Sequence, residues 1–204
     1  MPGLVIGVDL GATNIRAALG SIESGILRRV EEKTVQSESP DDVIQQFIRL
    51  IRMVSANDLD KVRAIGIGSI GPLDCWRGVI LNPPNVPFKN VHIVETLRDM
   101  FRVPVYLLND CTTAALGEWV FGAGRGLKNL AYITLSSGVG GGVIVDGTLL
   151  IGKDGNAAEI GHMVIDLEGR LTCNCGGRGH WGGILLGLWD TEARQISGQE
   201  QAGS

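Results

Sequence analysis

The chain has 204 residues, a formal net charge of −4 and 44% hydrophobic residues, a composition typical of a globular protein with one large domain or two small ones. Its 18 Lys and Arg residues are scattered along the chain, which disfavours a dedicated nucleic-acid binder. No apolar run reaches the length of a membrane span, and no basic flank precedes the first apolar segment at Leu4. We therefore expect neither a signal peptide nor a membrane anchor, and a cytoplasmic location.

The first part of the chain predicts three strands followed by a helix. Segments rich in β-branched and apolar residues, separated by turn residues, predict strands over Leu4–Asp9, Ile15–Gly20 and Leu27–Val35. Pro40 is expected at the first helical position, where its missing N–H does no harm. Apolar residues then recur at helical spacing and are expected to face the sheet; they are Val43, Phe47, Leu50 and Ile51.

The remaining pattern alternates between strands and helices. Further strands are expected over Val62–Ile70, Val103–Leu108, Leu130–Leu135 and Gly142–Val145, and helices over Val91–Met100 and Thr112–Val120. Both halves begin with a strand, a glycine turn and a second strand, which suggests a duplicated α/β fold with a cleft between two lobes. We expect an N-terminal lobe over 1–110, a partial second lobe over 111–181 and a divergent tail over 182–204.

Two glycine turns occupy equivalent places in the two halves. They are Asp9–Asn14 and Ser136–Gly142. Glycines let a backbone approach an anion, so the N–H groups and hydroxyls of such turns can hold phosphate oxygens, while a carboxylate at a strand end can hold Mg²⁺. Each turn by itself is equally compatible with an ordinary hairpin. The candidate nucleotide-binding residues are Asp9, Gly11, Thr13, Asn14, Gly138, Gly140 and Gly141.

Five motifs, in order, resemble those of ROK-family sugar kinases. They are Val8–Asn14, Leu108–Asp110, Gly138–Gly142, Glu159–His162 (ExGH) and Cys173–His180 (a CxCGxxG zinc motif). The resemblance covers residues 4–181. It implies an actin-like (RNase H-like) ATPase fold of two α/β lobes, the second incomplete here. It also implies transfer of the ATP γ-phosphoryl group to a hexose such as glucose, with Mg²⁺ and a structural Zn²⁺, and a homodimer.

Asp110 is the candidate general base for this reaction. It ends an apolar strand at the expected cleft, where a carboxylate can accept the proton of a sugar hydroxyl. From the residues alone it is equally well the N-cap of the following helix. The resemblance assigns it to catalysis and implies sugar contacts for Asn109, Glu159 and His162. Asn85 matches a family loop that closes over the sugar, or is a turn residue.

Four residues are candidate zinc ligands: His162, Cys173, Cys175 and His180. Two thiolates and two imidazoles suit a closed tetrahedral site, whose role is structural and which would hold His162 in place. The family more often carries a third cysteine where this chain has His180, and imidazole is an equally good ligand. The alternative is two unrelated reduced cysteines in a glycine-rich loop. Cys75 and Cys111 are expected to be core residues without chemistry.

The resemblance stops after Trp181. Family members continue with further helices, whereas this chain continues with Gly182–Gly187 and ends at Ser204. We interpret the tail as the result of a shifted reading frame or truncation, with a natural short form as the alternative. The expected function is ATP-dependent phosphorylation of a hexose at its 6-hydroxyl. The alternatives are a non-catalytic sugar-binding remnant and a sugar-responsive regulator.

Overall fold

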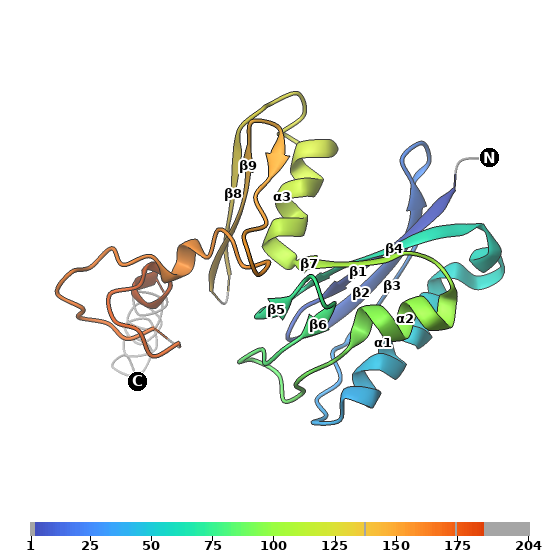
Figure 1. The fold of residues 1–204 in the computed structure, drawn as a ribbon, viewed down its shortest axis with the longest axis horizontal. Helices are drawn as coiled ribbons and strands as arrows, with labels where there is room; N and C mark the ends of the chain where they lie inside the picture. The colour runs from blue at the N-terminus through green and yellow to red at the C-terminus, as the bar shows by residue number, and fades with distance from the viewer. Residues whose placement is uncertain (1–2, 137, 174, 186–204) are drawn as a thin grey trace, which may run out of the picture.

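The computed structural model describes residues 3–136, 138–173 and 175–185, so most of the divergent tail lies outside the described residues. A five-stranded sheet in the order β3-β2-β1-β4-β7 forms the first part (Figure 1). The first three strands form an antiparallel meander, β4 pairs with β1 in parallel, and β7 pairs with β4 in parallel. The strands are β1 (Leu4–Leu10), β2 (Asn14–Ser21), β3 (Gly25–Lys33), β4 (Val62–Ser69) and β7 (Val105–Asn109).

Two helices, α1 (Pro40–Ser55) and α2 (Ile93–Phe101), cover one face of this sheet (Figure 1). Side chains alternate along a strand, so every second residue of β1 faces these helices and is buried. The apolar stripe of α1 meets them, because residues three and four apart share one face of a helix. Its expected inward residues Val43, Phe47, Leu50 and Ile51 are all fully buried, which confirms that prediction.

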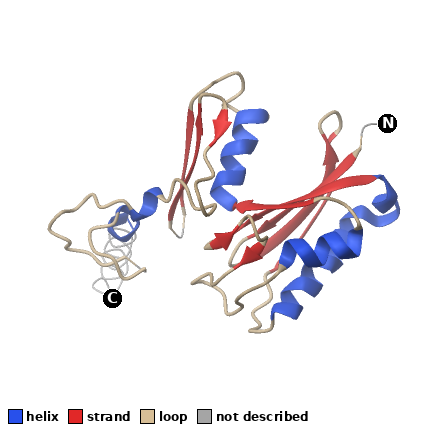
Figure 2. Cartoon of the chain, viewed as in Figure 1, coloured by secondary structure: helices blue, strands red, loops and turns tan. Residues whose placement is uncertain are grey.

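A second, smaller body begins directly after β7 (Figure 2). Helix α3 (Asp110–Val120) packs on a three-stranded antiparallel sheet in the order β10-β9-β8. Its strands are β8 (Leu130–Leu135), β9 (Val139–Val145) and β10 (Thr148–Leu149). The shorter elements are β5 (Leu73–Asp74), β6 (Val79–Ile80), and the 3-10 helices η1 (Ala56–Lys61) and η2 (Ile160–His162).

One predicted strand boundary is wrong. We expected the second glycine turn to run to Gly142, but β9 begins at Val139, which pairs with Leu135, and Gly140 and Gly141 continue the ladder. The turn is therefore limited to the residues around Gly138. Glycines carry no side chain, so the alternation that reveals a strand in a sequence is silent across such a run. The other predicted elements are present, with ends shifted by up to two residues.

Both sheets expose apolar side chains on one face. In the five-stranded sheet Val5 is 44% and Tyr106 63% exposed, and in the smaller sheet Leu135 is 62% exposed. A cavity of about 970 Å³ lies over the open face of the first sheet, where α3 contributes Thr113 and Leu116 to its lining.

Among the described residues, none of the helices combines the length and apolar character needed to cross a bilayer.

Candidate active site and metal centre

Asp110 lies at the junction of the two bodies, where β7 ends and α3 begins. The side chain of Asn109 caps this helix, because its Oδ1 accepts hydrogen bonds from the backbone N–H groups of Cys111 (2.9 Å) and Thr112 (3.3 Å). Asp110 is therefore not the N-cap. Its Oδ1 accepts a hydrogen bond from the Cys111 amide at 2.8 Å, which fixes the orientation of the carboxylate at the start of the helix.

Glu159 lies just before the 3-10 turn η2, and His162 is the last residue of that turn. The Glu159 carboxylate lies 3.9 Å from Nε2 of His162, and both side chains are half exposed. Partial burial raises the pKa of Glu159, the negative charge of Asp110 acts in the same direction, and His162 opposes them. The structure thus brings Glu159 within electrostatic reach of both Asp110 and His162.

Close backbone packing between β9 and α3 holds this arrangement. A Cβ added at Gly142 would lie 2.6 Å from the Cβ of Ala115 and 2.7 Å from the backbone oxygen of Cys111, and one at Gly140 would collide with the Cys111 sulfur. Glycine is thus required for packing at these positions. Gly140, one of the glycines predicted to bind phosphate, therefore has a structural reason to be present, in addition to any contact with a ligand.

We expect Gly142→Ala to destabilise the protein by about 2 kcal/mol, because the added methyl overpacks a contact made by backbone atoms. Gly117→Ala, on α3, is the matched control. A Cβ there meets nothing within 4 Å, so alanine's better helix propensity should stabilise the chain by up to about 1 kcal/mol. Urea unfolding of the two variants measures both effects. Equal stability of the two variants would contradict the packing argument.

The first glycine turn has its carbonyl groups tied to the segment after β3. The hydroxyl of Thr34 donates to the Gly11 oxygen (2.7 Å), and the Gln36 amide donates to the Ala12 oxygen (3.2 Å). The backbone N–H of Thr34 also donates to the oxygen of Thr13 (3.0 Å). The C=O and N–H of a trans peptide point in opposite directions. The N–H groups of residues 12 and 13 therefore point away from this segment, as a phosphate cradle requires.

Asp9, at the start of this turn, already has a cationic partner. Its Oδ2 lies 3.0 Å from Nη1 of Arg16, its neighbour across the strand pair, and Arg16 also lies 3.2 Å from Glu31 on β3.

Asn85 is exposed in the loop between β6 and α2. Among the described residues, no hydrogen bond or ion pair joins Asn85 to Asp110 or Glu159.

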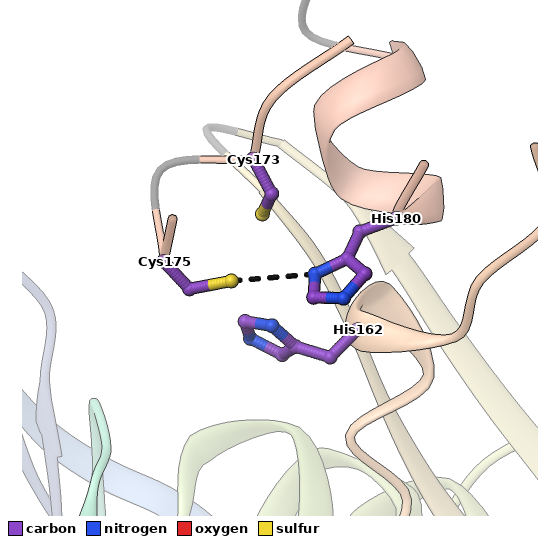
Figure 3. A group of neighbouring side chains, drawn as sticks. All are labelled: His162, Cys173, Cys175 and His180. Carbon is purple, nitrogen blue, oxygen red and sulfur yellow. Dashed lines mark hydrogen bonds between the residues drawn. The ribbon is translucent and has the colours of Figure 1, made fainter. Parts of the chain in front are cut away.

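The four predicted metal ligands form one cluster, shown in Figure 3. Their ligand atoms all lie within 4.8 Å of one another, and the Cys175 sulfur lies 3.3 Å from Nδ1 of His180. The rings of His162 and His180 meet edge to face, with centroids 5.5 Å apart. Ligand atoms around a tetrahedral zinc are about 3.3–3.8 Å apart, given bonds of 2.0–2.3 Å. The cluster therefore fits zinc with a small inward movement of the side chains.

Asp166 organises the loop between His162 and the cysteines, and sequence reasoning missed it. Its carboxylate is almost fully buried and accepts hydrogen bonds from the backbone and guanidinium of Arg170 and from the Glu168 amide. These bonds hold the pKa of Asp166 below its usual value, with the Arg170 side chain as the largest cause. The opposite charges at positions 166 and 170 are the signal that could have revealed the pair.

We expect the Cys111 thiol to resist modification. Burial, together with the neighbouring Asp110 carboxylate, raises its pKa from 9.0 to about 12. Its thiolate population at pH 8 is then about a thousandfold below that of an ordinary cysteine, and the thiolate is the reactive form. Iodoacetamide labelling of metal-free protein, followed by peptide mapping, should modify the exposed Cys175 well before Cys111. Labelling of both at the same rate would contradict this.

With this geometry in place, the chain was compared with known proteins. The ROK family profile matches residues 5–188. The chain belongs to the ROK family. A glucokinase from Pyrobaculum calidifontis is 42% identical over 182 residues, which cover 89% of this chain and 57% of that protein. The chain thus spans less than two thirds of the length of this curated ROK relative.

Solved structures show the same fold. The ROK glucokinase of Streptomyces griseus, in complex with glucose and AMPPNP, superposes with a TM-score of 0.76 and 34% identity, over 88% of this chain and 56% of that one. A ROK family transcriptional regulator, a homologue of the E. coli MLC protein, gives a TM-score of 0.82 at 27% identity, over 98% and 50%. These likenesses confirm the predicted actin-like α/β fold, with a second lobe represented in part.

Proposed function

We propose that this ROK chain carries the hexose- and phosphate-binding part of an ATP-dependent hexose kinase, with Asp110 as the general base. The observation that carries the proposal is the position of Glu159, which lies beside His162 and within electrostatic reach of Asp110. Two carboxylates and an imidazole offer the acceptors and donors that a polyol needs. The glucokinases among its relatives support the same reaction class.

In this proposal the hexose lies between Glu159 and Asp110. The Glu159 carboxylate and the His162 ring hydrogen-bond sugar hydroxyls and orient the 6-hydroxyl toward the γ-phosphorus. As the oxygen attacks, its proton passes to the Asp110 carboxylate and the bond from phosphorus to the ADP oxygen breaks. Asn109 uses its Oδ1 to cap α3, so its amide NH₂ is the part left to contact the sugar.

The two glycine turns would hold the nucleotide phosphates. The proposed contacts are the backbone of Gly11 and Thr13, the Asn14 side chain, the turn residue Gly138, and Gly140 and Gly141 near the start of β9. Asp9 is the proposed carboxylate for hydrated Mg²⁺, whose chemistry is to neutralise charge on the phosphates. Because Arg16 shares one Asp9 oxygen, the cation would be held through the other oxygen or through water. Asn85 remains a proposed sugar contact.

The metal cluster would have a structural role. With His162, Cys173, Cys175 and His180 as ligands, zinc has four protein donors and no open position, so it offers no site for an activated water. Its contribution would be to fix the ring of His162, whose other nitrogen is then available to the sugar.

Incubation of the chain with Mg²⁺-ATP and a panel of hexoses tests the proposal. We expect ADP release that depends on the hexose, and a 6-phosphate product identified by ³¹P NMR. ADP release without sugar, or none with any hexose, would contradict it.

The second candidate is a sugar-binding module of a regulator, favoured by the likeness to the ROK transcriptional regulator. Calorimetry, which measures hexose binding, and the ADP assay together distinguish the two functions. A regulator module would bind hexose without forming ADP, whereas a kinase would bind hexose and form ADP.

A further inference from the structure

The two bodies of the fold touch at a place apart from the chain connection at Asn109–Asp110 and the packing of α3 on β4 beside it. The indole Nε1 of Trp76 donates a hydrogen bond of 2.7 Å to the backbone oxygen of Lys153, 77 residues further along the chain. The amide of Asn156 reaches the Leu73 oxygen at 3.5 Å. We call this contact the clasp: Leu73, Cys75 and Trp76 from the first body, with Lys153, Gly155 and Asn156 from the second.

The clasp includes a tight contact that leaves no room for a side chain. The Cys75 sulfur lies 3.9 Å from the Gly155 oxygen, and a Cβ added at Gly155 would be only 2.5 Å from that sulfur. Gly155 also has φ +85°, which side-chain-bearing residues rarely adopt. Glycine is therefore required here both by the backbone conformation and by the approach of the first body.

The second-body part of the clasp leads directly into the sugar-binding residues. Only Ala157 and Ala158 separate Asn156 from Glu159. The Ala157 amide donates a hydrogen bond to the Ile151 oxygen (3.1 Å), and the Ile160 amide donates one to the Ala158 oxygen (2.7 Å). These internal hydrogen bonds order the segment. A displacement of the clasp would therefore be transmitted to the Glu159 carboxylate.

We propose that Trp76 is a positioning residue, which acts through the clasp to set the angle between the two bodies and the place of Glu159 relative to Asp110. The chain connection at 109–110 and the packing of α3 on β4 beside it still allow rotation about that junction, whereas an attachment elsewhere restricts the rotation. Hexose then binds to carboxylates that are already in position, and less ordering is needed on binding. This inference rests on the proposed function for its hexose readout, but not for its structural readout.

Trp76→Phe tests the proposal, because it keeps an aromatic ring and deletes the N–H donor. Loss of one hydrogen bond should raise the rate of amide hydrogen exchange across residues 151–162 about fivefold, and should weaken hexose binding by a similar factor. Exchange is measured by mass spectrometry and hexose affinity by calorimetry. Trp119→Phe is the matched control, since Trp119 makes the same 2.7 Å bond to the Leu127 oxygen within the second body. It should change neither quantity.

Gly155→Ala provides an independent variant, with Gly147→Ala as its control. Both glycines have positive φ, but a Cβ at Gly147 meets nothing within 4 Å, whereas one at Gly155 strikes Cys75. We expect Gly155→Ala to raise the amide exchange rate across residues 151–162 more than Gly147→Ala does.

If the amide exchange rate across residues 151–162 is unchanged in both Trp76→Phe and Gly155→Ala, the proposal that the clasp holds the two bodies is wrong. Raised exchange with unaltered hexose affinity overturns the positioning role. If the unmodified chain binds no hexose, that failure belongs to the proposed function, and the exchange data alone decide whether the clasp holds the two bodies.

Discussion

Replacing Asp110 by Asn is expected to lower the rate of hexose phosphorylation by about 10²–10⁴-fold while hexose affinity is largely retained. The amide cannot accept the hydroxyl proton during attack. Its Oδ1 can still accept the hydrogen bond from the Cys111 amide, so the start of α3 is preserved. ADP release gives the rate, and calorimetry gives the hexose affinity.

The matched control is Asp99→Asn, the same change at an exposed position of α2, which should leave the rate unchanged. A parallel loss of rate and hexose affinity in Asp110→Asn would indicate a general binding defect. A rate within a few-fold of the unmodified chain would assign the proton to another acceptor, and Glu159 would be the first candidate because it lies within electrostatic reach of Asp110.

Removal of zinc is the second large effect that we expect. The unmodified chain should contain one zinc per molecule by elemental analysis. Cys173→Ser should weaken zinc binding by more than the roughly 10–100-fold that changes to outer-shell residues cause. The ligands must be deprotonated to bind the metal, so zinc affinity should fall as the pH is lowered.

The structural consequence of zinc loss should be local. The backbone bonds of this region run among its own residues, for example from Cys173 to Gly177 and from Trp181 to Met163. We therefore expect chelation to raise amide exchange across 162–181 while the buried core around Phe47 remains protected. Cys111→Ala, which changes a cysteine outside the cluster, should retain zinc. Full zinc content after Cys173→Ser would remove that residue from the ligand set.

Much of the first body follows from local patterns in the sequence. The apolar face of α1 around Phe47 is recognisable from apolar residues at helical spacing, and the strand Leu4–Leu10 from its apolar composition. Both patterns involve residues only a few positions apart in the sequence. Cys173, Cys175 and His180 were predictable as metal ligands because they lie within eight residues of each other, and the resemblance to the ROK family added His162.

Other features depend on contacts that no local pattern contains. Asn109 and Asp110 are both good helix caps, and only the backbone conformation at the end of β7 assigns the cap to Asn109. Gly140 belongs to a strand because Thr134 lies opposite it. The sequence offers no sign that Asp9 is paired with Arg16, since that pairing follows from the register of two strands.

By itself, the sequence determined the order of the elements, the turns at the strand ends and the set of titratable and metal-binding side chains, because each of these is encoded by neighbouring residues. The tertiary structure decided which of those side chains meet. Asp110 comes within electrostatic reach of Glu159 because β9 packs on α3 without intervening side chains. Trp76 reaches Lys153 only because the two bodies approach each other across 77 residues of chain, a distance at which no periodicity carries information.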